Sequence, residues 1–250
     1  MTNLPTRSQP RTVTINSDLG ESLGLHSFGN DLQLMRSVDE ANVACGFHSG
    51  DPDTMVATVE AAAHHGLTVG AHPGLPDLVG FGRREMRLTP SEVENLILYQ
   101  VGALTGSLRR VGLTLNHLKP HGSLYGMLSR DAELMNAAAN VALLYGVPFY
   151  GLAGTQHETV CRERGVPFVS ELYVDLNYGA AGQLLIQRRP EPTDPVAASE
   201  RVRRALTDGV VEAVDGTLLT FEFDSICVHS DAPNSVAVAA AVRDTLTSLS

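Results

Sequence analysis

Short apolar runs alternate with longer amphipathic stretches along most of this chain. The runs are four to six residues long and end in Gly, Pro or polar residues, which is typical of strands buried in a parallel sheet. The stretches between them repeat apolar residues with the 3.6-residue period of a helix. The pattern predicts strands at residues 12–16, 42–45, 67–70, 113–118, 147–152, 166–169 and 225–228, and helices at residues 31–38, 52–65, 90–110, 132–145, 156–164, 195–214 and 233–249.

The helix predicted at residues 52–65 carries clear end signals. Asp51 stands at the N-cap position, Pro52 occupies the first helical position and Gly66 follows the last periodic residue. Two other segments, residues 71–88 and 171–194, are rich in Gly and Pro, and we expect both to be irregular. A loop as long as residues 71–88 in a compact domain is usually functional.

Seven strand-then-helix units without a break in composition indicate one α/β domain with a parallel sheet. Polar residues follow so many of the strands that a closed barrel is favoured, because an open sheet gathers its binding residues at one switch point. We therefore predict a single seven-stranded parallel β/α barrel of the TIM-like kind over residues 12–250. Residues 1–11 are polar with two prolines and are predicted to form a flexible tail.

Composition narrows the possible functions. The chain has 250 residues, 43% of them hydrophobic, and a net charge of −10. An acidic chain without basic runs argues against nucleic acid and anionic membranes as partners. No apolar stretch reaches the ~18 residues of a membrane-spanning helix, and the polar N-terminus does not resemble a signal peptide. With three cysteines as a sparse, odd set, a cytoplasmic protein with reduced thiols is expected.

Four histidines end four different predicted strands, and a barrel would bring them to one mouth. They are His48, His72, His121 and His229. Carboxylates at other strand ends accompany them, namely Asp18, Glu21 and Asp231. Such a cluster could bind a divalent metal, although none of the predicted helices carries an HxxxH or HExxH pair that would support one. The alternative is acid–base and electrostatic work by groups without a metal.

One lysine stands out among the cations. Of the 18 basic residues, 17 are arginine, and the exception is Lys119, which lies at a strand end two residues before His121. A lone lysine in such a chain suggests a need for a compact ammonium charge with a tunable pKa. Arg83 and Arg84 lie together in the Gly-rich loop, where paired guanidinium groups suit a carboxylate or phosphate. The chain contains neither a P-loop, GxxxxGK[ST], nor a nucleophile elbow, GxSxG.

Five segments in chain order resemble the LamB/YcsF family, which includes the A subunit of bacterial ATP-dependent 5-oxoprolinase. They are NSDLGES (residues 16–22), ANVACGFHSGDP (41–52), GAHPGLPDLVGFGRR (70–84), KPHGSLYG (119–126) and ICVHSDAP (226–233). The resemblance implies a seven-stranded barrel like that of polysaccharide deacetylases. It also implies ring-opening of 5-oxo-L-proline to L-glutamate, with ATP used by a complex that contains partner subunits B and C.

Residues that match the family's motifs take their expected roles from this resemblance. The expected catalytic residues are Asp18, His48, Lys119 and His121, and the expected substrate-binding residues are Glu21, His72, Arg83, Arg84, His229 and Asp231. We expect Asp18 or a strand-end histidine to deprotonate water, and Lys119 and His121 to stabilise charge. Arg83 or Arg84 would hold the substrate carboxylate. Where the family commonly reads Asp-Arg, this chain reads Asp175-Leu176, so one arginine is missing.

Two other functions compete with this expectation. The first is a metal-dependent amidohydrolase or deacetylase acting on a small carboxylate-bearing amide, by analogy with the barrel. The second is a non-catalytic subunit that binds a small acid and docks its partners. Metal content would favour the former, and turnover that is insensitive to Lys119→Ala and His121→Ala would favour the latter.

Overall fold

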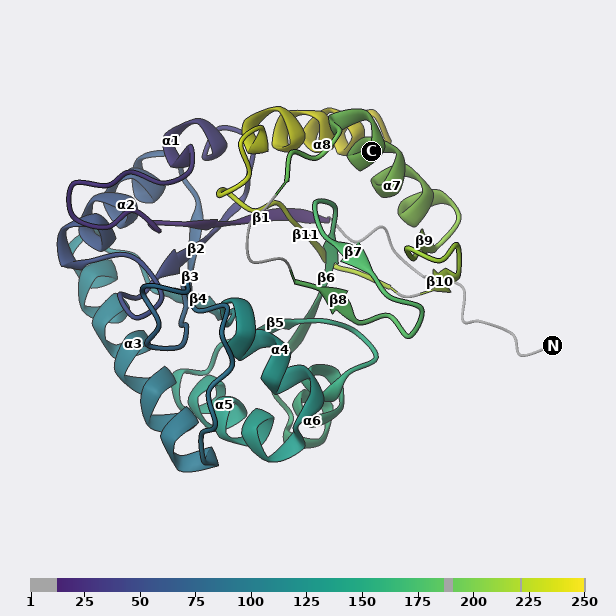
Figure 1. Ribbon diagram of the computed structural model, residues 1–250. Helices are drawn as coiled ribbons and strands as arrows, with labels where there is room; N and C mark the ends of the chain where they lie inside the picture. The colour runs from purple at the N-terminus through teal and green to yellow at the C-terminus, as the bar shows by residue number, and fades with distance from the viewer. Residues whose placement is uncertain (1–12, 187–190, 221, 250) are drawn as a thin grey trace.

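A closed barrel of seven parallel strands forms the centre of the protein in a computed structural model that describes residues 13–186, 191–220 and 222–249. Its strands in order around the barrel are β1 (Thr14–Leu19), β11 (Ser225–Cys227), β6 (Phe168–Tyr173), β5 (Phe149–Gly151), β4 (Leu115–Leu118), β3 (Thr68–His72) and β2 (Glu40–Ala44). Figure 1 shows the strands at the centre of a ring of helices. The predicted single-domain barrel is confirmed, and the predicted tail at residues 1–11 lies outside the described residues.

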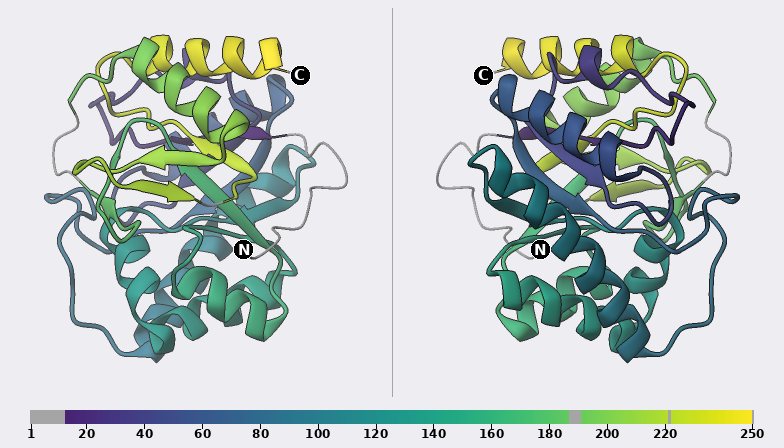
Figure 2. Two further views of the ribbon diagram at one scale, coloured as in Figure 1. Left: turned by 90° about the vertical axis from the view of Figure 1, so that its right-hand side faces the viewer. Right: turned by 90° about the vertical axis from the view of Figure 1, so that its left-hand side faces the viewer.

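Helices cover most of the outside of the barrel in Figures 1 and 2. They are α1 (Asp31–Leu34), α2 (Pro52–His64), α3 (Pro90–Arg110), α4 (Gly122–Arg130), α5 (Ala132–Tyr145), α6 (Gln156–Arg164), α7 (Pro195–Thr207) and α8 (Ser235–Leu249). The main apolar core lies between strands and helices and includes Ile15, Val43 and Ile226 from the barrel. None of the described helices is long and apolar enough to cross a membrane.

Helix ends follow the signals in the sequence. The Asp51 carboxylate accepts hydrogen bonds from the backbone N–H groups of Asp53 and Thr54, at 2.9 and 3.0 Å, as the cap of α2. Its second oxygen accepts from Gly24 N–H at 2.8 Å and so ties α2 to the loop after β1. At α3, Thr89 and Glu92 form a reciprocal capping box. The predicted cap at Asp51 is confirmed.

Four features differ from the predicted elements. β1 continues to Leu19 and β6 to Tyr173, so residues expected in loops lie in strands. α4 was not predicted. The helix predicted at residues 195–214 ends at Thr207 because Gly209 has a positive φ of 69°, and β9 (Val210–Glu212) pairs with β10 (Leu218–Thr220). The segment predicted as irregular contains a small hairpin of β7 (Asn177–Tyr178) and β8 (Leu184–Leu185).

The barrel interior is unusually polar for a TIM-like fold, in which branched apolar residues dominate. At its N-terminal end, the buried Glu40 accepts hydrogen bonds from Tyr150 Oη at 2.8 Å and Thr14 Oγ1 at 3.2 Å. Above this layer, Asn42 donates to Asn16 Oδ1 at 2.8 Å across adjacent strands. Buried polar groups are tolerated only when they are hydrogen-bonded, so these partners hold the strands in register. The next layer along the axis is the functional site.

Candidate functional site

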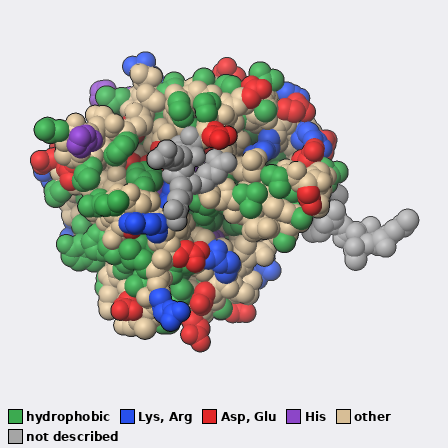
Figure 3. All heavy atoms as spheres, in the orientation of Figure 1, with side chains coloured by type: hydrophobic (Ala, Val, Ile, Leu, Met, Phe, Trp, Pro, Cys, Tyr) green, Lys and Arg blue, Asp and Glu red, His purple; other side chains and the backbone are tan. Residues whose placement is uncertain are grey.

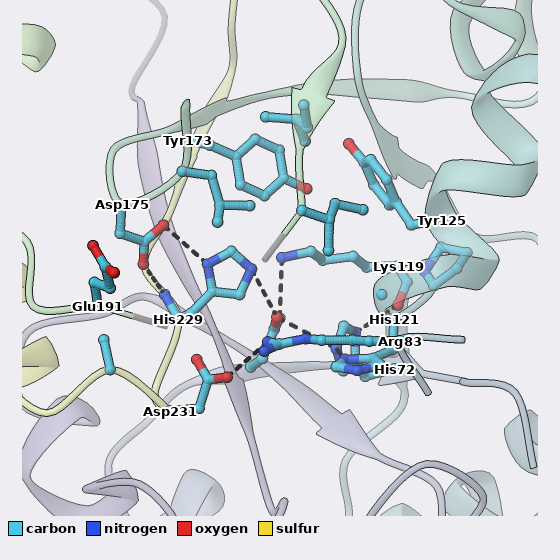
Figure 4. Close-up of a pocket in the computed structure, with 17 residues that line it drawn as sticks. His72, Arg83, Lys119, His121, Tyr125, Tyr173, Asp175, Glu191, His229 and Asp231 are labelled. Carbon is cyan, nitrogen blue, oxygen red and sulfur yellow. Dashed lines mark hydrogen bonds and ion pairs between the residues drawn. The ribbon is translucent and has the colours of Figure 1, made fainter. Parts of the chain in front are cut away.

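A cavity opens at the C-terminal ends of the barrel strands, where β/α barrels carry their sites (Figure 4). Its empty space, with the open mouth included, is about 620 Å³. Its polar lining comes from Asp18, His72, Arg83, Lys119, His121, Asp175, Glu191, His229 and Asp231. Its apolar lining includes Tyr125, Tyr173, Leu176, Leu184 and Ile186.

Lys119 is the buried centre of the cavity floor and is only 1% exposed. Its Nζ lies 3.0 Å from Asp18 Oδ1, 3.2 Å from Glu171 Oε1 and 2.9 Å from Cys227 Sγ. It also donates to Asn16 Oδ1 at 3.0 Å. Burial favours the neutral amine, but the nearby negative groups, Asp18 first, outweigh it and raise the pKa of Lys119 well above its usual value. Lys119 is therefore a fixed positive charge rather than a proton acceptor.

Asp18 lies between the lysine and two histidines. Its Oδ2 lies 3.3 Å from His72 Nε2 and 3.6 Å from His229 Nε2, and Asn42 donates to its Oδ1 at 2.8 Å. Burial alone would raise the pKa of this carboxyl. The neighbouring charges of His72 and Lys119 reverse that effect and hold the pKa well below its usual value. Asp18 is ionised at neutral pH.

Three buried histidines gather with Glu21 on one side of Asp18. The rings of His48 and His121 stack in parallel, with centroids 3.8 Å apart and planes 4° apart. His72 Nε2 lies 2.9 Å from His121 Nδ1, and His48 Nε2 lies 3.1 Å from Glu21 Oε1. Burial first, and then a neighbouring histidine, lowers the pKa of both His48 and His121 well below the usual value. Burial and the charge of Asp18 raise the pKa of Glu21.

His229 on the opposite side has the reverse electrostatics. Its Nδ1 donates to Asp175 Oδ1 at 2.9 Å, and its backbone N–H donates to Asp175 Oδ2 at 2.7 Å. Burial opposes the charged ring, but the charge of Asp175, its hydrogen bond and the charge of Asp18 raise the pKa of His229 to about 9. Figure 4 shows this ring beside the carboxylate of Asp175. His229 therefore carries a positive charge at neutral pH.

The two adjacent arginines point to different places. Arg83 lines the cavity and donates from Nη2 to Asp231 Oδ2 at 2.7 Å. Arg84 instead forms a two-nitrogen contact with the buried Asp77, and half of its side chain is exposed. Phe81, with a positive φ of 54°, and Gly82, with 62°, twist the loop just before the pair. Arg84 does not line the cavity, so its predicted role in substrate binding has no geometric support and stays a prediction.

Comparison with known proteins shows which family this chain is similar to. The family model described as LamB/YcsF matches residues 13–250. The chain belongs to the LamB/YcsF family. It is 46% identical over 232 residues to the lactam utilization protein lamB of Emericella nidulans, with 91% of each chain covered. It is 44% identical over 238 residues to the A subunit of 5-oxoprolinase from Thermus thermophilus, with 94% of this chain and 95% of that one covered.

A solved structure extends the similarity to three dimensions. The crystal structure of the lactam utilization protein from Thermus thermophilus matches with a TM-score of 0.88 at 42% identity, over 95% of this chain and 97% of that one. The barrel and the helices around it are therefore the fold of this LamB/YcsF family.

The structure gathers most of the candidate residues of this LamB/YcsF protein at one mouth. Asp18, Glu21 and the four strand-end histidines lie in one connected set around Lys119, and Arg83 with Asp231 closes its rim. The prediction that the four histidines converge is confirmed. Their individual catalytic or binding roles stay predictions.

Two acidic residues of the site had no role predicted from the sequence, although Asp175 stands in the Asp-Leu pair that departs from the family pattern. Glu171 is fully buried in β6 beside Lys119, and Asp175 fixes His229. Both fall in the segment that was predicted as irregular. The available signal was the sequence FVSELY, six residues that favour a strand and carry a carboxylate at a position where an apolar residue would be expected.

Proposed function

We propose that this protein is the A subunit of an ATP-dependent 5-oxoprolinase, which opens the ring of 5-oxo-L-proline to give L-glutamate together with partner subunits B and C. The observation that carries the proposal is its full-length similarity to proteins named as the A subunit of 5-oxoprolinase and as lactam utilization proteins. The cavity adds support, because three cations, Arg83, Lys119 and His229, line it and suit an acidic substrate.

The lining of the cavity matches the two ends of this substrate. Arg83 offers donors for the carboxylate of 5-oxoproline. Leu176, Leu184 and Ile186 offer an apolar wall for the methylene groups of the ring. Leu176 replaces the arginine common in the family, so Arg83 becomes our first candidate for the carboxylate.

The chemistry explains why ATP is needed. A five-membered lactam is stabilised by resonance, and transfer of a phosphoryl group to its amide oxygen makes the ring carbon electrophilic. Water then adds to that carbon, the C–N bond breaks, and the nitrogen takes a proton as it leaves. The acyl phosphate that remains is hydrolysed by a second water to glutamate and phosphate.

Charges of the described residues suit this sequence of steps. Asp18 is ionised and can accept a proton from the attacking water, while Lys119 and His229 can stabilise negative charge that develops on oxygen. We revise one expected role here. His121 has a lowered pKa and donates its Nε2–H to Phe81 O at 2.8 Å, so we assign the stabilising charge to His229 instead.

Exposed apolar side chains near the mouth support contact with partner subunits. Leu25 and Val79 are almost fully exposed, and Phe28 and Leu78 are about half exposed. The rings of Phe28 and Phe81 lie 6.2 Å apart and bring the loops after β1 and β3 together. In Figure 3, hydrophobic side chains gather toward the left of the displayed face. Contiguous exposed apolar groups often mark interaction surfaces.

Because the chain has no P-loop, we assign ATP binding to the assembled complex.

The decisive experiment measures glutamate formed from 5-oxo-L-proline and ATP by this chain mixed with its B and C partners. We expect product only when all three are present, and a loss of ~10²–10³ in turnover for Lys119→Ala. His64→Ala, at the exposed end of α2, is the matched control and should retain turnover. Circular dichroism of each variant separates loss of function from loss of fold. No glutamate from a folded complex would refute the proposal.

A metal-dependent amidohydrolase is the second candidate, because Glu21, His72 and His121 bring metal-binding atoms together. Hydrolysis of a small amide by this chain alone, without ATP or partners, would favour it. A non-catalytic subunit would instead give a complex whose turnover is unchanged by Lys119→Ala and His121→Ala.

A further inference from the structure

Three buried side chains at the cavity floor direct possible metal-binding atoms toward one point. His72 Nε2 lies 2.9 Å from His121 Nδ1. Glu21 Oε1 lies 3.4 Å from the same His121 nitrogen and 4.0 Å from His72 Nε2. All three side chains are at most 3% exposed. They come from the loops or strand ends that follow β1, β3 and β4, so the fold holds them independently of one another.

Hydrogen bonds to the backbone fix where each imidazole carries its proton. His72 Nδ1 lies 2.8 Å from the Lys119 carbonyl oxygen, and His121 Nε2 lies 2.8 Å from the Phe81 carbonyl oxygen. A carbonyl only accepts, so each ring donates its N–H there. The lone pairs of His72 Nε2 and His121 Nδ1 then face each other at 2.9 Å. This contact is repulsive unless a proton or a metal ion lies between the two nitrogens. Asp18 Oδ2 lies 3.3 Å from His72 Nε2 and favours a positive charge of either kind there.

The spacing of the three atoms suits a metal ion. From their separations of 2.9, 3.4 and 4.0 Å, a point equally far from all three lies about 2.0 Å from each, the usual length of a bond from zinc to imidazole nitrogen or carboxylate oxygen. Both imidazoles also donate their outer N–H to a carbonyl, which is how metal-binding histidines are usually held. A metal would thus satisfy all three atoms at once.

His48 is excluded from the same coordination sphere by its stacking. An imidazole binds a metal that lies close to the plane of its ring, and the rings of His48 and His121 are parallel at 3.8 Å. One ion cannot lie in both planes. The rings of His72 and His121, by contrast, are 88° apart and can share an ion. His48 Nε2 lies 3.1 Å from Glu21 Oε1, where it can donate to the carboxylate and orient it.

We propose that Glu21, His72 and His121 bind one divalent transition-metal ion, with His48 as a positioning residue for Glu21. Two histidines and one carboxylate suit Zn²⁺ first and Fe²⁺ second. Three protein ligands leave a coordination position open. Because His72 and His121 line the cavity, that position is accessible to a small molecule bound there. The site does not depend on the identity of the substrate, so it can be tested without any turnover assay.

The test is metal binding by the full chain after chelator treatment. Separate samples receive Zn²⁺ or, without oxygen, Fe²⁺, and bound metal is measured after desalting. We expect about one ion per chain for the wild type with the preferred metal, as in sites of this ligand set. Glu21→Gln and His72→Ala should each retain under about a tenth of that. His48→Ala should keep the ion with ~10–100-fold weaker affinity, the usual effect of losing a residue that orients a ligand.

Controls make each outcome decisive. His64→Ala, exposed at the end of α2, should bind as the wild type does and so measures adventitious binding to surface histidines. Circular dichroism in the absence of metal checks that each variant is folded, and His72→Gln replaces any alanine variant that is not. A folded wild type that binds neither ion would overturn the proposal and leave a shared proton between the two nitrogens. Loss of metal in His48→Ala as complete as in His72→Ala would overturn the three-ligand assignment.

Discussion

The two sides of the cavity use the same residue types, but their histidines reach different charge states. On one side His48, His72 and His121 surround Glu21, and on the other side His229 lies between Asp175 and Asp18. The pKa values of His48 and His121 are lowered, whereas the pKa of His229 is raised to about 9. Burial pushes all three histidines toward the neutral form, so burial cannot explain the difference.

The ratio of carboxylates to histidines explains it. His229 has two carboxylates within 3.6 Å, and they outweigh the cost of burying its charge. His48 and His121 share a single carboxyl group, Glu21, and lie against other imidazoles. A histidine cluster that is poor in carboxylates is suited to act as a set of neutral ligands, and a histidine between two carboxylates is suited to act as a fixed cation. Asp18 touches both sides and couples them.

Removing the charge of Lys119 should have the largest effect, because this ammonium balances the acidic residues between the two sides. Lys119→Met would leave Asp18 and Glu171 buried without their cation. Breaking a buried ion pair in this way typically costs about 3–5 kcal/mol of folding free energy. Urea unfolding of the isolated chain measures the loss.

A second variant tests whether the unpaired charge is the cause. Lys119→Met combined with Glu171→Gln removes one of the uncompensated carboxylates and should recover part of the lost stability. Residues in contact usually show interaction energies of about 0.5–3 kcal/mol in such a cycle. Strictly additive effects would show that the lysine and Glu171 are not energetically coupled.

Raising the pH should remove the part of the folding stability that depends on the positive charge of His229. The folded-state pKa of His229 is about 9, against 6.5 for the unfolded chain, so folding favours its protonated form. The resulting stability is fully present below pH 6.5 and is lost as the pH rises to about 9. The difference corresponds to roughly 3 kcal/mol. Unfolding free energies of the wild type and His229→Gln, measured across this window, should converge at its upper end. Parallel curves would contradict the raised pKa.

The strand–helix order and the convergence of the histidines could be predicted because both depend on local sequence. Seven apolar runs with polar ends give seven strands, and a barrel closure then determines which ends meet. The charge on each histidine could not be predicted, because it depends on partners far along the chain. Asp175 and His229, for example, are 54 residues apart. Local patterns hold no information about such a pair.

Strand lengths and side-chain directions account for the other differences. Asp18 and Glu171 lie within β1 and β6, whereas the apolar runs alone ended each strand early. Strands that point polar side chains into the barrel cannot be recognised to their full length from apolar runs alone. Arg83 and Arg84 are equivalent in sequence, but the positive φ angles of Phe81 and Gly82 set the turn that separates their directions.

An intermediate loss of stability is expected from crowding the neutral side of the cavity, which is the side formed by His48, His72, His121 and Glu21. A Cβ at position 74 would collide with the His48 ring, so Gly74→Ala should displace that ring from its stack on His121. Overpacking of this kind typically costs about 1–3 kcal/mol. Gly106→Ala is the matched control, since a Cβ there meets no atom within 4 Å in the middle of α3. It should instead stabilise the protein by up to about 1 kcal/mol. Thermal unfolding distinguishes the two, and equal shifts would contradict the crowding argument.

The smallest effect is expected at Asp51, which supports the neutral side from outside. It caps α2 through Asp53 and Thr54 N–H and holds the loop after β1 through Gly24 N–H. These hydrogen bonds, those from Thr54 and Gly24 first, lower its pKa to about 2. Asp51→Ala should cost about 1 kcal/mol, the usual effect of a lost N-cap. Asp51→Asn keeps an oxygen for the cap but replaces the acceptor that serves Gly24. If Asp51→Asn loses as much stability as Asp51→Ala, the stabilisation comes from the contact with the loop. If only Asp51→Ala loses stability, the stabilisation comes from the cap of the helix.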